Sequence, residues 1–490
     1  MTFLSLTYGL FLIGFLGIYW IIPNTNWRLF IIVIASLTFY ASWQIQYIPL
    51  LLITILFNYC LANGIGEPLD WRIANDEWNI RRLLLLWLGI IVNILLLFSF
   101  KYIPFLLNTL GSLYNLPILL ESASWVQSYV IPPLGLSFFC FECIAYLIDI
   151  YRGAPACASP LHFTAYKFFF PKLISGPITR YHNFINQFKN LQFPHPEKMT
   201  EGLWLIAIGA VKKALLADNL GRFVDLSFSN LQRAGSEDLW LATFAYGLQL
   251  YLDFSGYVDI AIGSAVLMGL TLPQNFDYPY FSTSIADFWR RWHITLGDWL
   301  RNYIYFPLGG SRVGLIRTCL NLFIIMLIAG IWHGAAWGFI VWGMLHGLGL
   351  IIHRITEAIS LKLSLESLWK TIPGIFFSWF LTQAMVFGTW IFFRLPNFKD
   401  SGWLISHLWN YPSDAQFVQK VYLESLGVTR SQITDCLIAI GLLMTLSYGL
   451  NRGLKLDLNW GIKLVLIPLC FYAVWLLAPQ GGLPYIYFDF

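Results

Sequence analysis

Long runs of apolar residues with few charges inside them recur along almost the whole chain, and they constrain the fold more than any other feature. About twenty such residues let a helix cross the hydrocarbon core of a bilayer, where only helices and closed barrels satisfy the backbone. Clear runs occupy residues 3–22, 29–43, 47–65, 83–100, 130–150, 204–216, 240–257, 315–331, 335–352, 375–393, 433–450 and 462–478. Weaker runs at 103–120, 163–174 and 261–270 are interpreted as spans or re-entrant helices. The sequence therefore predicts an all-α, polytopic integral membrane protein with about 11–13 transmembrane or re-entrant helices.

Composition and charge support the same class of protein. Hydrophobic residues make up 58% of the 490 residues and charged residues only 11%, whereas soluble domains carry roughly 25% charged residues. A net charge of +4 without a clustered basic face gives no basis for a nucleic-acid partner. The polar segments are too short for a separate soluble domain, so we expect one transmembrane domain over residues 1–490.

The N-terminal run and the basic residues that follow it bear on topology. Residues 2–22 lack a basic region and a small-residue cleavage site, which favours a first transmembrane helix over a cleaved signal peptide. Arg28, Arg72, Arg81 and Arg82 follow the first and third runs. Positive-inside counting then places the N-terminus outside and these loops in the cytoplasm.

A dense cluster of charged, aromatic and small residues spans 287–310, unlike a lipid-facing helix. A charge at the centre of a membrane costs about 2.5–3.5 kcal/mol, so such residues need a reason to be there. At helical spacing Arg290 could pair with His293, and Asp298 with Arg301. The alternative interpretation is an interfacial anchor of Trp and Arg, but His, Asp and Asn add nothing to anchoring.

Two further histidines interrupt apolar sequence. The run 315–331 ends at Trp332-His333-Gly334, and His346 lies inside the next run. An imidazole in apolar surroundings stays neutral and can act as a general base toward a hydroxyl. The alternative for His333 is a buried histidine hydrogen-bonded between helices, and for His346 the two interpretations are equally good. No metal site is predicted, because the two histidines have neither i,i+4 spacing nor a carboxylate between them.

Several short motifs occur in a fixed order between residues 130 and 395. They lie at 133–139, 146–153, 171–178, 211–214, 252–257, 288–310, 332–334 and 390–394. In this order the chain resembles the membrane-bound O-acyltransferase family. The likeness is closest to the branch of the alginate O-acetyltransferase membrane subunit and the D-alanyl transfer membrane protein of teichoic-acid modification.

The resemblance implies a helical bundle around a tunnel, with an acyl donor reaching one side and the acceptor the other. It places the invariant family histidine at His333 and the second functional histidine at His293. Asn302 stands where an Asp is more usual, and Glu142 where a Gln is expected. The predicted catalytic residues are therefore His333, His293 and Asn302. The residues predicted to bind donor or substrate are Arg290, Arg291, Trp292, Asp298, Arg301, Trp332 and His346.

The expected reaction is transfer of an acetyl group from a cytoplasmic thioester, acyl-CoA or another, to a hydroxyl of an exported polysaccharide. Transfer would be direct or through an extracytoplasmic acetyltransferase partner, in the cytoplasmic membrane among its lipids and without a cofactor. Two related alternatives are D-alanyl transfer and acylation of a lipid acceptor. A polysaccharide transporter or flippase without chemistry is an alternative of another class, which the lack of a visible internal repeat disfavours.

Overall fold

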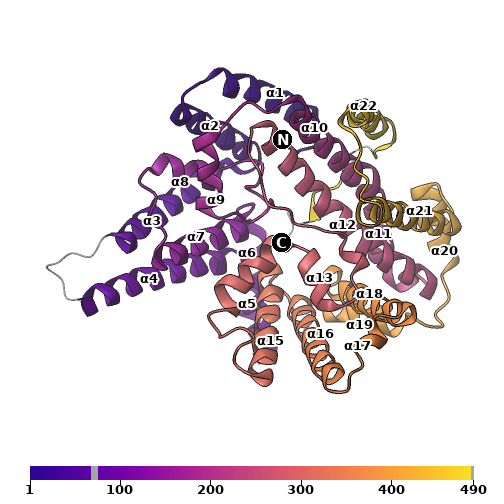
Figure 1. Ribbon diagram of the computed structural model, residues 1–490. Helices are drawn as coiled ribbons and strands as arrows, with labels where there is room; N and C mark the ends of the chain where they lie inside the picture. The colour runs from indigo at the N-terminus through magenta and orange to yellow at the C-terminus, as the bar shows by residue number, and fades with distance from the viewer. Residues whose placement is uncertain (68–74, 480, 487–490) are drawn as a thin grey trace. The chain divides into compact units, whose positions relative to one another are not determined.

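A computed structural model describes residues 1–67, 75–479 and 481–486, and all regular structure in these ranges is helical (Figure 1). Contacts between Cα atoms group the chain into two compact units. Unit 1 comprises Met1–Ile206 and Ile260–Pro273, and unit 2 comprises Ala207–Asp259 and Gln274–Phe490. Arg72 lies outside the described residues. The sequence predicts a single domain over the whole chain. Whether the two units act together as one domain stays a prediction.

The helices follow one another with short connections. Unit 1 contains α1 (Leu6–Ile21), α2 (Thr25–Gln44), η1 (Ile45–Tyr47), α3 (Ile48–Gly66), α4 (Asn75–Lys101), α5 (Ile103–Tyr114), α6 (Pro117–Tyr129), α7 (Leu136–Tyr151), α8 (Pro160–Lys167), α9 (Tyr181–Ile185) and η2 (Asn186–Asn190). Two helices contribute to both units, α10 (Pro196–Ala210) and α12 (Ser236–Leu267). Unit 2 contains η3 (Val211–Ala217), α11 (Asp218–Ser229), η4 (Leu231–Arg233), η5 (Pro279–Phe281), α13 (Ile285–Arg291), α14 (Ile294–Leu300), η6 (Arg301–Tyr305), α15 (Leu315–His333), α16 (Trp337–Lys362), α17 (Glu366–Trp369), α18 (Ile372–Arg394), α19 (Phe398–Ser406), α20 (Ala415–Phe417), η7 (Val418–Leu426), α21 (Arg430–Tyr448), η8 (Gly449–Gly453) and α22 (Trp460–Leu477).

Eight helical stretches among the described residues are long and apolar enough to cross a bilayer. They are Thr25–Gly66, Glu77–Lys101, Ser236–Leu267, Leu315–His333, Trp337–Lys362, Ile372–Arg394, Arg430–Gly453 and Trp460–Leu477. The first of them holds two of the predicted runs, and α1 is shorter, with 16 residues. The all-α, multi-pass class that the sequence predicts is confirmed.

Some predicted runs form shorter elements than expected. The run 130–150 becomes α7, which begins only at Leu136 because Gly135 adopts a left-handed conformation with φ 74°. A Cβ at that position would lie 2.5 Å from the carbonyl oxygen of Leu173, so the chain approaches too closely for any other residue. The weaker run 103–120 folds as the α5–α6 pair, with Asn115 left-handed between the two helices.

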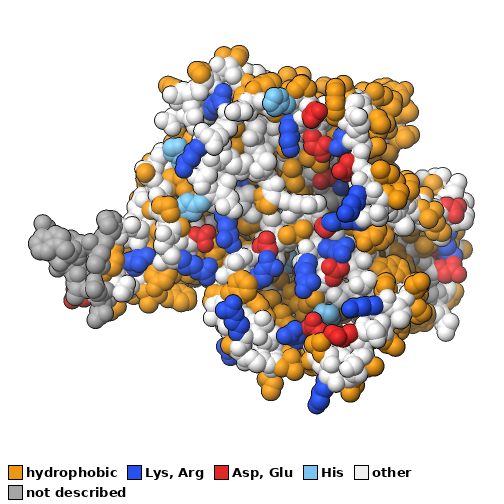
Figure 2. Space-filling model, in the orientation of Figure 1, with side chains coloured by type: hydrophobic (Ala, Val, Ile, Leu, Met, Phe, Trp, Pro, Cys, Tyr) orange, Lys and Arg blue, Asp and Glu red, His pale blue; other side chains and the backbone are white. Residues whose placement is uncertain are grey.

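Burial separates helices that face outward from helices in the core. Only 6% of the residues in the apolar windows of α21 and α22 are buried, whereas 83% are buried in the window of α12. Figure 2 shows hydrophobic side chains spread over the region of α21 and α22. Apolar faces of this kind are the expected contacts of membrane helices with lipid tails.

The hairpin of α15 and α16 is the frame of the candidate site in unit 2. The helices are joined by three residues, 334–336, and therefore run antiparallel. Their backbones approach closely where Gly330 faces Gly343, because a Cβ on Gly330 would lie 2.3 Å from the carbonyl oxygen of Phe339. On its other sides α16 packs against α13 and α18. This packing brings parts of α13, α15, α16 and α18 together at the candidate site.

Candidate active site

His293 lies at the sharp turn between α13 and α14. Its φ of 45° is in the left-handed region, which histidine adopts more readily than most residues but still at a cost of about 1–3 kcal/mol. Asn275 holds the turn from the other side, since its carbonyl oxygen accepts from Ile294 N at 3.0 Å and its Oδ1 accepts from Thr295 N and Oγ1. The strained conformation is thus fixed by specific bonds, as is common at functional sites.

The His293 ring is fully buried beside aromatic rings. Its centroid lies 4.9 Å from that of Phe254 on α12 and 6.0 Å from that of Trp332 on α15. Burial lowers the pKa of His293 to about 3, because the charged imidazolium would lose its hydration. The ring is therefore neutral at physiological pH and can accept a proton.

His333 is the last residue of α15, and the structure brings it next to His293. The two ring centroids are 6.5 Å apart, which is too far for a direct hydrogen bond between the imidazoles but close enough for both to reach one reacting group. His333 is 2% exposed, and the rings of Trp342 and Phe393 each lie 5.1 Å from it. Two histidines forty residues apart in sequence therefore face the same aromatic enclosure.

His346 lies one layer away on α16, with both ring nitrogens occupied. Trp289 Nε1 donates to His346 Nδ1 at 3.3 Å, and His346 Nε2 lies 2.9 Å from Thr389 Oγ1. An indole N–H only donates, so Nδ1 must be unprotonated and Nε2 carries the proton of the neutral ring. The Thr389 hydroxyl accepts a hydrogen bond from this Nε2–H group and donates one to the carbonyl oxygen of Val386. This bonding leaves His346 holding its neighbours in place, with the tilted ring of Trp342 centred 4.7 Å from its own ring centroid.

Three tryptophans close the enclosure. Trp292, Trp342 and Trp390 are each at most 1% exposed, and Trp342 and Trp390 stack with an interplanar angle of 19°. Trp292 lies 5.1 Å from Trp390, between α13 and α18. Such rings exclude water, so a proton transfer inside them takes place in a medium of low polarity.

The charged residues of the 287–310 cluster lie away from the two histidines. Arg291 pairs with Asp287 at 3.0 Å, and Arg301 pairs with Asp298 as its spacing predicts. The pairing of Arg290 with His293 is wrong, because α13 ends at Arg291 and the chain then turns His293 inward. Arg290 stays exposed and forms no ion pair with the residues that the structure describes.

Asn302 lies in the π-helical η6 that follows α14. Its Nδ2 donates to the carbonyl oxygen of Asp298 at 2.7 Å, and its side chain is half-buried. The amide oxygen of Asn302 takes no part in that bond. The role of Asn302 in catalysis stays a prediction.

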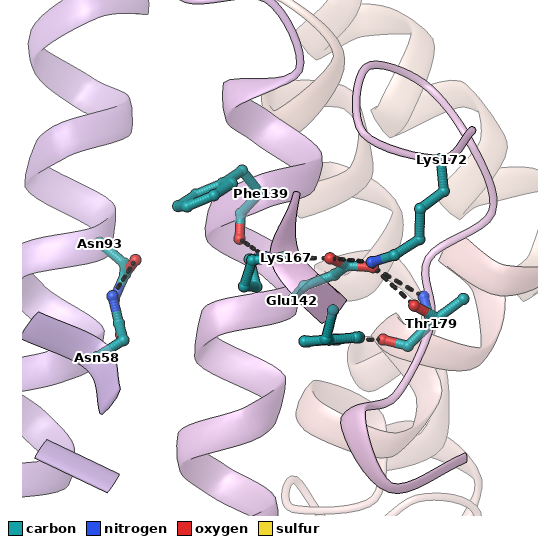
Figure 3. A network of polar contacts seen from close by, with 8 residues as sticks. Asn58, Asn93, Phe139, Glu142, Lys167, Lys172 and Thr179 are labelled. Atoms are coloured by element: carbon teal, nitrogen blue, oxygen red, sulfur yellow. Dashed lines mark hydrogen bonds and ion pairs between the residues drawn. The ribbon is translucent and has the colours of Figure 1, made fainter. Parts of the chain in front are cut away.

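Unit 1 contains a buried cluster of charged residues around Glu142. In the sequence its only sign was that Glu142 stands where a Gln is expected. Lys172 Nζ donates to Glu142 Oε1 at 2.6 Å, Lys167 Nζ donates to Oε2 at 3.0 Å, and Thr179 N donates to Oε1 at 3.0 Å (Figure 3). Lys167 also donates to the carbonyl oxygen of Phe139. The cluster ties the segment 168–179 to α7, which is a structural explanation for the motifs at 133–139 and 171–178.

A second buried cluster explains the motifs at 211–214 and 252–257 in unit 2. Lys213 Nζ lies 2.5 Å from Asp253 Oδ1 and 2.8 Å from Asp218 Oδ1. Asp253 Oδ2 also accepts from Ile486 N, and Lys213 donates to the carbonyl oxygen of Pro484. The C-terminal segment is thereby held against α12, one residue from Phe254. Sequence reasoning missed this arrangement because its partners are far apart along the chain.

Comparisons with known proteins extend beyond the motifs. The sequence profile described as MBOAT, membrane-bound O-acyltransferase family, matches residues 92–393. A probable alginate O-acetylase of Pseudomonas aeruginosa is 37% identical over 391 residues, which cover 80% of this chain and 71% of the relative. A peptidoglycan O-acetyltransferase of Helicobacter pylori is 36% identical over 420 residues, covering 79% and 76%. A teichoic acid D-alanyltransferase of Bacillus subtilis is 27% identical over 275 residues, covering 54% and 69%.

Proposed function

Because the chain belongs to the membrane-bound O-acyltransferase family and is a multi-pass O-acyltransferase, we propose that it acetylates a hydroxyl of an exported polysaccharide in the cytoplasmic membrane. The donor is a cytoplasmic thioester such as acetyl-CoA. The acetyl group passes directly to the polymer or through an extracytoplasmic acetyltransferase. The observation that carries this proposal is the pair of buried histidines 6.5 Å apart in an enclosure of aromatic rings.

In the proposed reaction the acceptor oxygen attacks the thioester carbonyl carbon. The carbon–sulfur bond breaks, and the hydroxyl proton passes through an imidazole to the departing thiolate. His333 is the general base, because it ends α15 inside the enclosure and close to His293. The neutral ring of His293 and the amide of Asn302 orient the donor or share the proton. Either direct transfer or a transient acyl-imidazole satisfies this chemistry.

Donor binding is proposed for the exposed side of the 287–310 cluster. A guanidinium binds phosphate in a bidentate manner, and Arg290 has no ion-pair partner among the described residues, unlike Arg291 and Arg301. Arg290 is therefore our first choice for the phosphate of a nucleotide-bearing thioester. Trp292, next to Arg291 in sequence, and Trp332, whose ring centroid lies 6.0 Å from that of His293, are proposed to contact the donor between this side and the histidines.

The names of the relatives support an acyl acceptor in the cell envelope. Acetyl transfer is favoured because the relatives named for O-acetylation match 79–80% of this chain, compared with 54% for the D-alanyltransferase. D-alanyl transfer remains the second candidate, since that relative belongs to the same branch. Membership in an acyltransferase family argues against the transporter alternative.

The test is the ester content of exported polysaccharide in cells with the wild-type protein, His333→Ala or no protein, at matched membrane expression. Acetate and D-alanine released by mild base are both measured, together with acetyl groups in the lipid fraction. We expect acetate to rise only with the wild type, and the variant to lose about 10²–10⁴-fold in rate as for loss of a general base.

His195→Ala is the matched control, because His195 is exposed in unit 1 and outside the site. Acetylation by His333→Ala at the wild-type level would refute the catalytic assignment. Release of D-alanine, or an acetylated lipid with unmodified polymer, would replace the proposed substrate by one of the alternatives.

A further inference from the structure

A cavity in unit 2 lies apart from His293 and His333, at the far end of α16. Its volume is about 560 Å³, and it is bounded by α16, α17, α18 and the residues before α13. It is half-open to the outside and occupies residues 349–361 of α16, whereas His333 lies beside the opposite end of that helix. Figure 2 shows histidine, acidic and basic side chains close together over the region of α16.

The inner end of the cavity is closed toward the active site. A Cβ on Gly349 would lie 2.3 Å from Met385 Cε and 3.7 Å from Ile285 Cγ1, so these three residues pack without a gap. The Trp289, His346 and Thr389 layer follows one helical turn further in. At this inner end the cavity stops at that layer, and His293 and His333 are not among the residues that line it.

The outer rim carries two opposite charges that the protein leaves unmatched. Glu366 and Lys370 both line the cavity and are exposed, and neither forms an ion pair with the residues that the structure describes. The other rim carboxylate, Glu357, is already paired with Arg354 at 2.7 Å. An occupant with one anionic and one cationic group would satisfy Lys370 and Glu366 together.

The rim is held on both sides of α17, because Leu365 N, just before the helix, donates to the carbonyl oxygen of Ser360 at 2.9 Å and the C-terminal end has further bonds. Trp369 Nε1 donates to Ser360 Oγ at 3.0 Å, which ties α17 to α16. Thr371 then caps α18 by accepting from Gly374 N, and it donates to the carbonyl oxygen of Leu368. Glu366 and Lys370 are therefore presented at fixed positions rather than on a loose loop.

The walls of the cavity below the rim are apolar and open sideways. Ile352, Leu361 and Leu381 line it with 65%, 59% and 51% of their surface exposed. They belong to two helices long enough to span a bilayer, where such faces contact acyl chains. A charged rim above an apolar side wall matches an amphiphile whose charges lie at one end.

We propose that this cavity binds a membrane phospholipid with a primary-amine headgroup, phosphatidylethanolamine. Its phosphate binds Lys370, with the ring of His353 as a second contact, and its ammonium donates to Glu366. One acyl chain lies along Leu381 and Ile352. A choline headgroup has no N–H to donate to the carboxylate, and a glycerol headgroup has no cation for it.

The proposal is tested by native mass spectrometry of the full chain released from nanodiscs of equal phosphatidylethanolamine, phosphatidylglycerol and phosphatidylcholine. We expect one retained phosphatidylethanolamine on the wild type. Lys370→Ala, Glu366→Gln and Leu381→Ser should each weaken retention about tenfold, the effect of losing one good contact. Lys399→Ala, an exposed lysine on α19 away from the cavity, should retain the lipid as the wild type does.

Melting temperatures of the variants exclude misfolding as the cause of a loss. Soluble glycerophosphoethanolamine should not displace the lipid, because it lacks the chain that contacts Leu381. Retention of phosphatidylglycerol or phosphatidylcholine in its place overturns the headgroup assignment. Equal retention by the wild type and all three cavity variants, or none by any, overturns the site. Binding is read without acyl transfer, so the result is independent of the proposed reaction.

Discussion

At the scale of single residues, the hydrogen bonds of His346 indicate that it positions its neighbours rather than taking part in the reaction. Its Nδ1 accepts from Trp289 and its Nε2 donates to Thr389, so the ring fixes Trp342 against His333. A glutamine can reproduce both bonds with its amide, whereas a phenylalanine leaves Trp289 and Thr389 without a partner. We expect His346→Phe to lower kcat about tenfold, since unsatisfied buried groups cost about 1–3 kcal/mol.

His346→Gln should recover most of that loss, with little change in KM for the donor. The measurement is the initial rate of acetyl transfer in membranes at several donor concentrations, with His333→Ala beside it. If His346→Gln were as inactive as His333→Ala, His346 would touch substrate rather than position its neighbours.

The burial of His293 has a consequence for pH dependence. Because burial lowers its pKa to about 3, the ring stays neutral as the pH falls through the usual range near 6.5. The neutral form is present above the lowered pKa, so protonation of His293 cannot cause a loss of rate in mild acid. We therefore expect the ratio of the rates at pH 5.5 and pH 7.5 to be the same, within about twofold, in the wild type and in His293→Gln.

The pH profile is measured with open membrane vesicles and saturating donor, for the wild type and for His293→Gln. An acid limb near pH 6.5 that is present in the wild type and absent in His293→Gln would contradict the neutral, buried ring.

At the scale of elements, the charged cluster of Figure 3 holds the segment 168–179 to α7. Among the residues that the structure describes, Glu142 is the only carboxylate paired with Lys167 and Lys172, whose side chains are at most 2% exposed. Removing one partner of a buried pair costs about 3–5 kcal/mol, because the remaining charge stays buried. Glu142→Gln should therefore lower the melting temperature of the detergent-solubilised protein clearly.

Glu67→Gln is the matched control, since Glu67 pairs with Arg81 at the surface of the same unit, where a pair contributes little. Adding Lys172→Met to Glu142→Gln should restore part of the stability by removing one unmatched charge. A melting temperature of Glu142→Gln equal to that of the control would show that the cluster is not needed for this contact.

How far the sequence predicts these elements depends on whether the signal is local. Apolar runs predicted both ends of α15 and α18 within a few residues, because span length is set by the bilayer, but α16 continues ten residues past the predicted end at 352 to Lys362. The turn at His293 was not foreseen, because nothing before it in sequence marks a left-handed residue and Asn275 holds it from eighteen positions away. The closeness of His293 and His333 was likewise implied only by resemblance, since the two are forty positions apart with α14, η6 and most of α15 between them.

At the scale of the whole molecule, the family resemblance that the ordered motifs indicated is confirmed by the profile match and the relatives. Those motifs mark two kinds of residue that sequence alone does not separate. Some line the histidine enclosure, such as Trp332, and others, such as Lys172 and Lys213, form buried ion pairs away from it. The sequence therefore pointed to these positions, and the structure separates those at the enclosure from those in buried ion pairs.

The direction in which the chain crosses the membrane decides which side each substrate meets. Arg312 precedes α15 and Arg317 lies in its first turn, whereas Lys362 ends α16 and Lys370 lies beyond it, so antiparallel packing places all four at one end of the hairpin. Positive-inside counting predicts that this end is cytoplasmic. Because α18 runs back alongside α16, residues after Arg394 then lie on the opposite face.

Cysteines introduced one at a time, in a chain whose seven native cysteines are replaced, report this direction through an impermeant maleimide. We expect Ser311→Cys and Ser364→Cys to react only after cells are opened, and Asn410→Cys to react in intact cells. His333 then lies at the end of α15 remote from the cytoplasm, so a donor that enters from the cytoplasm must reach more than halfway across before transfer. Labelling of Ser311→Cys in intact cells would reverse the topology and require a donor from outside, which no cytoplasmic thioester could supply.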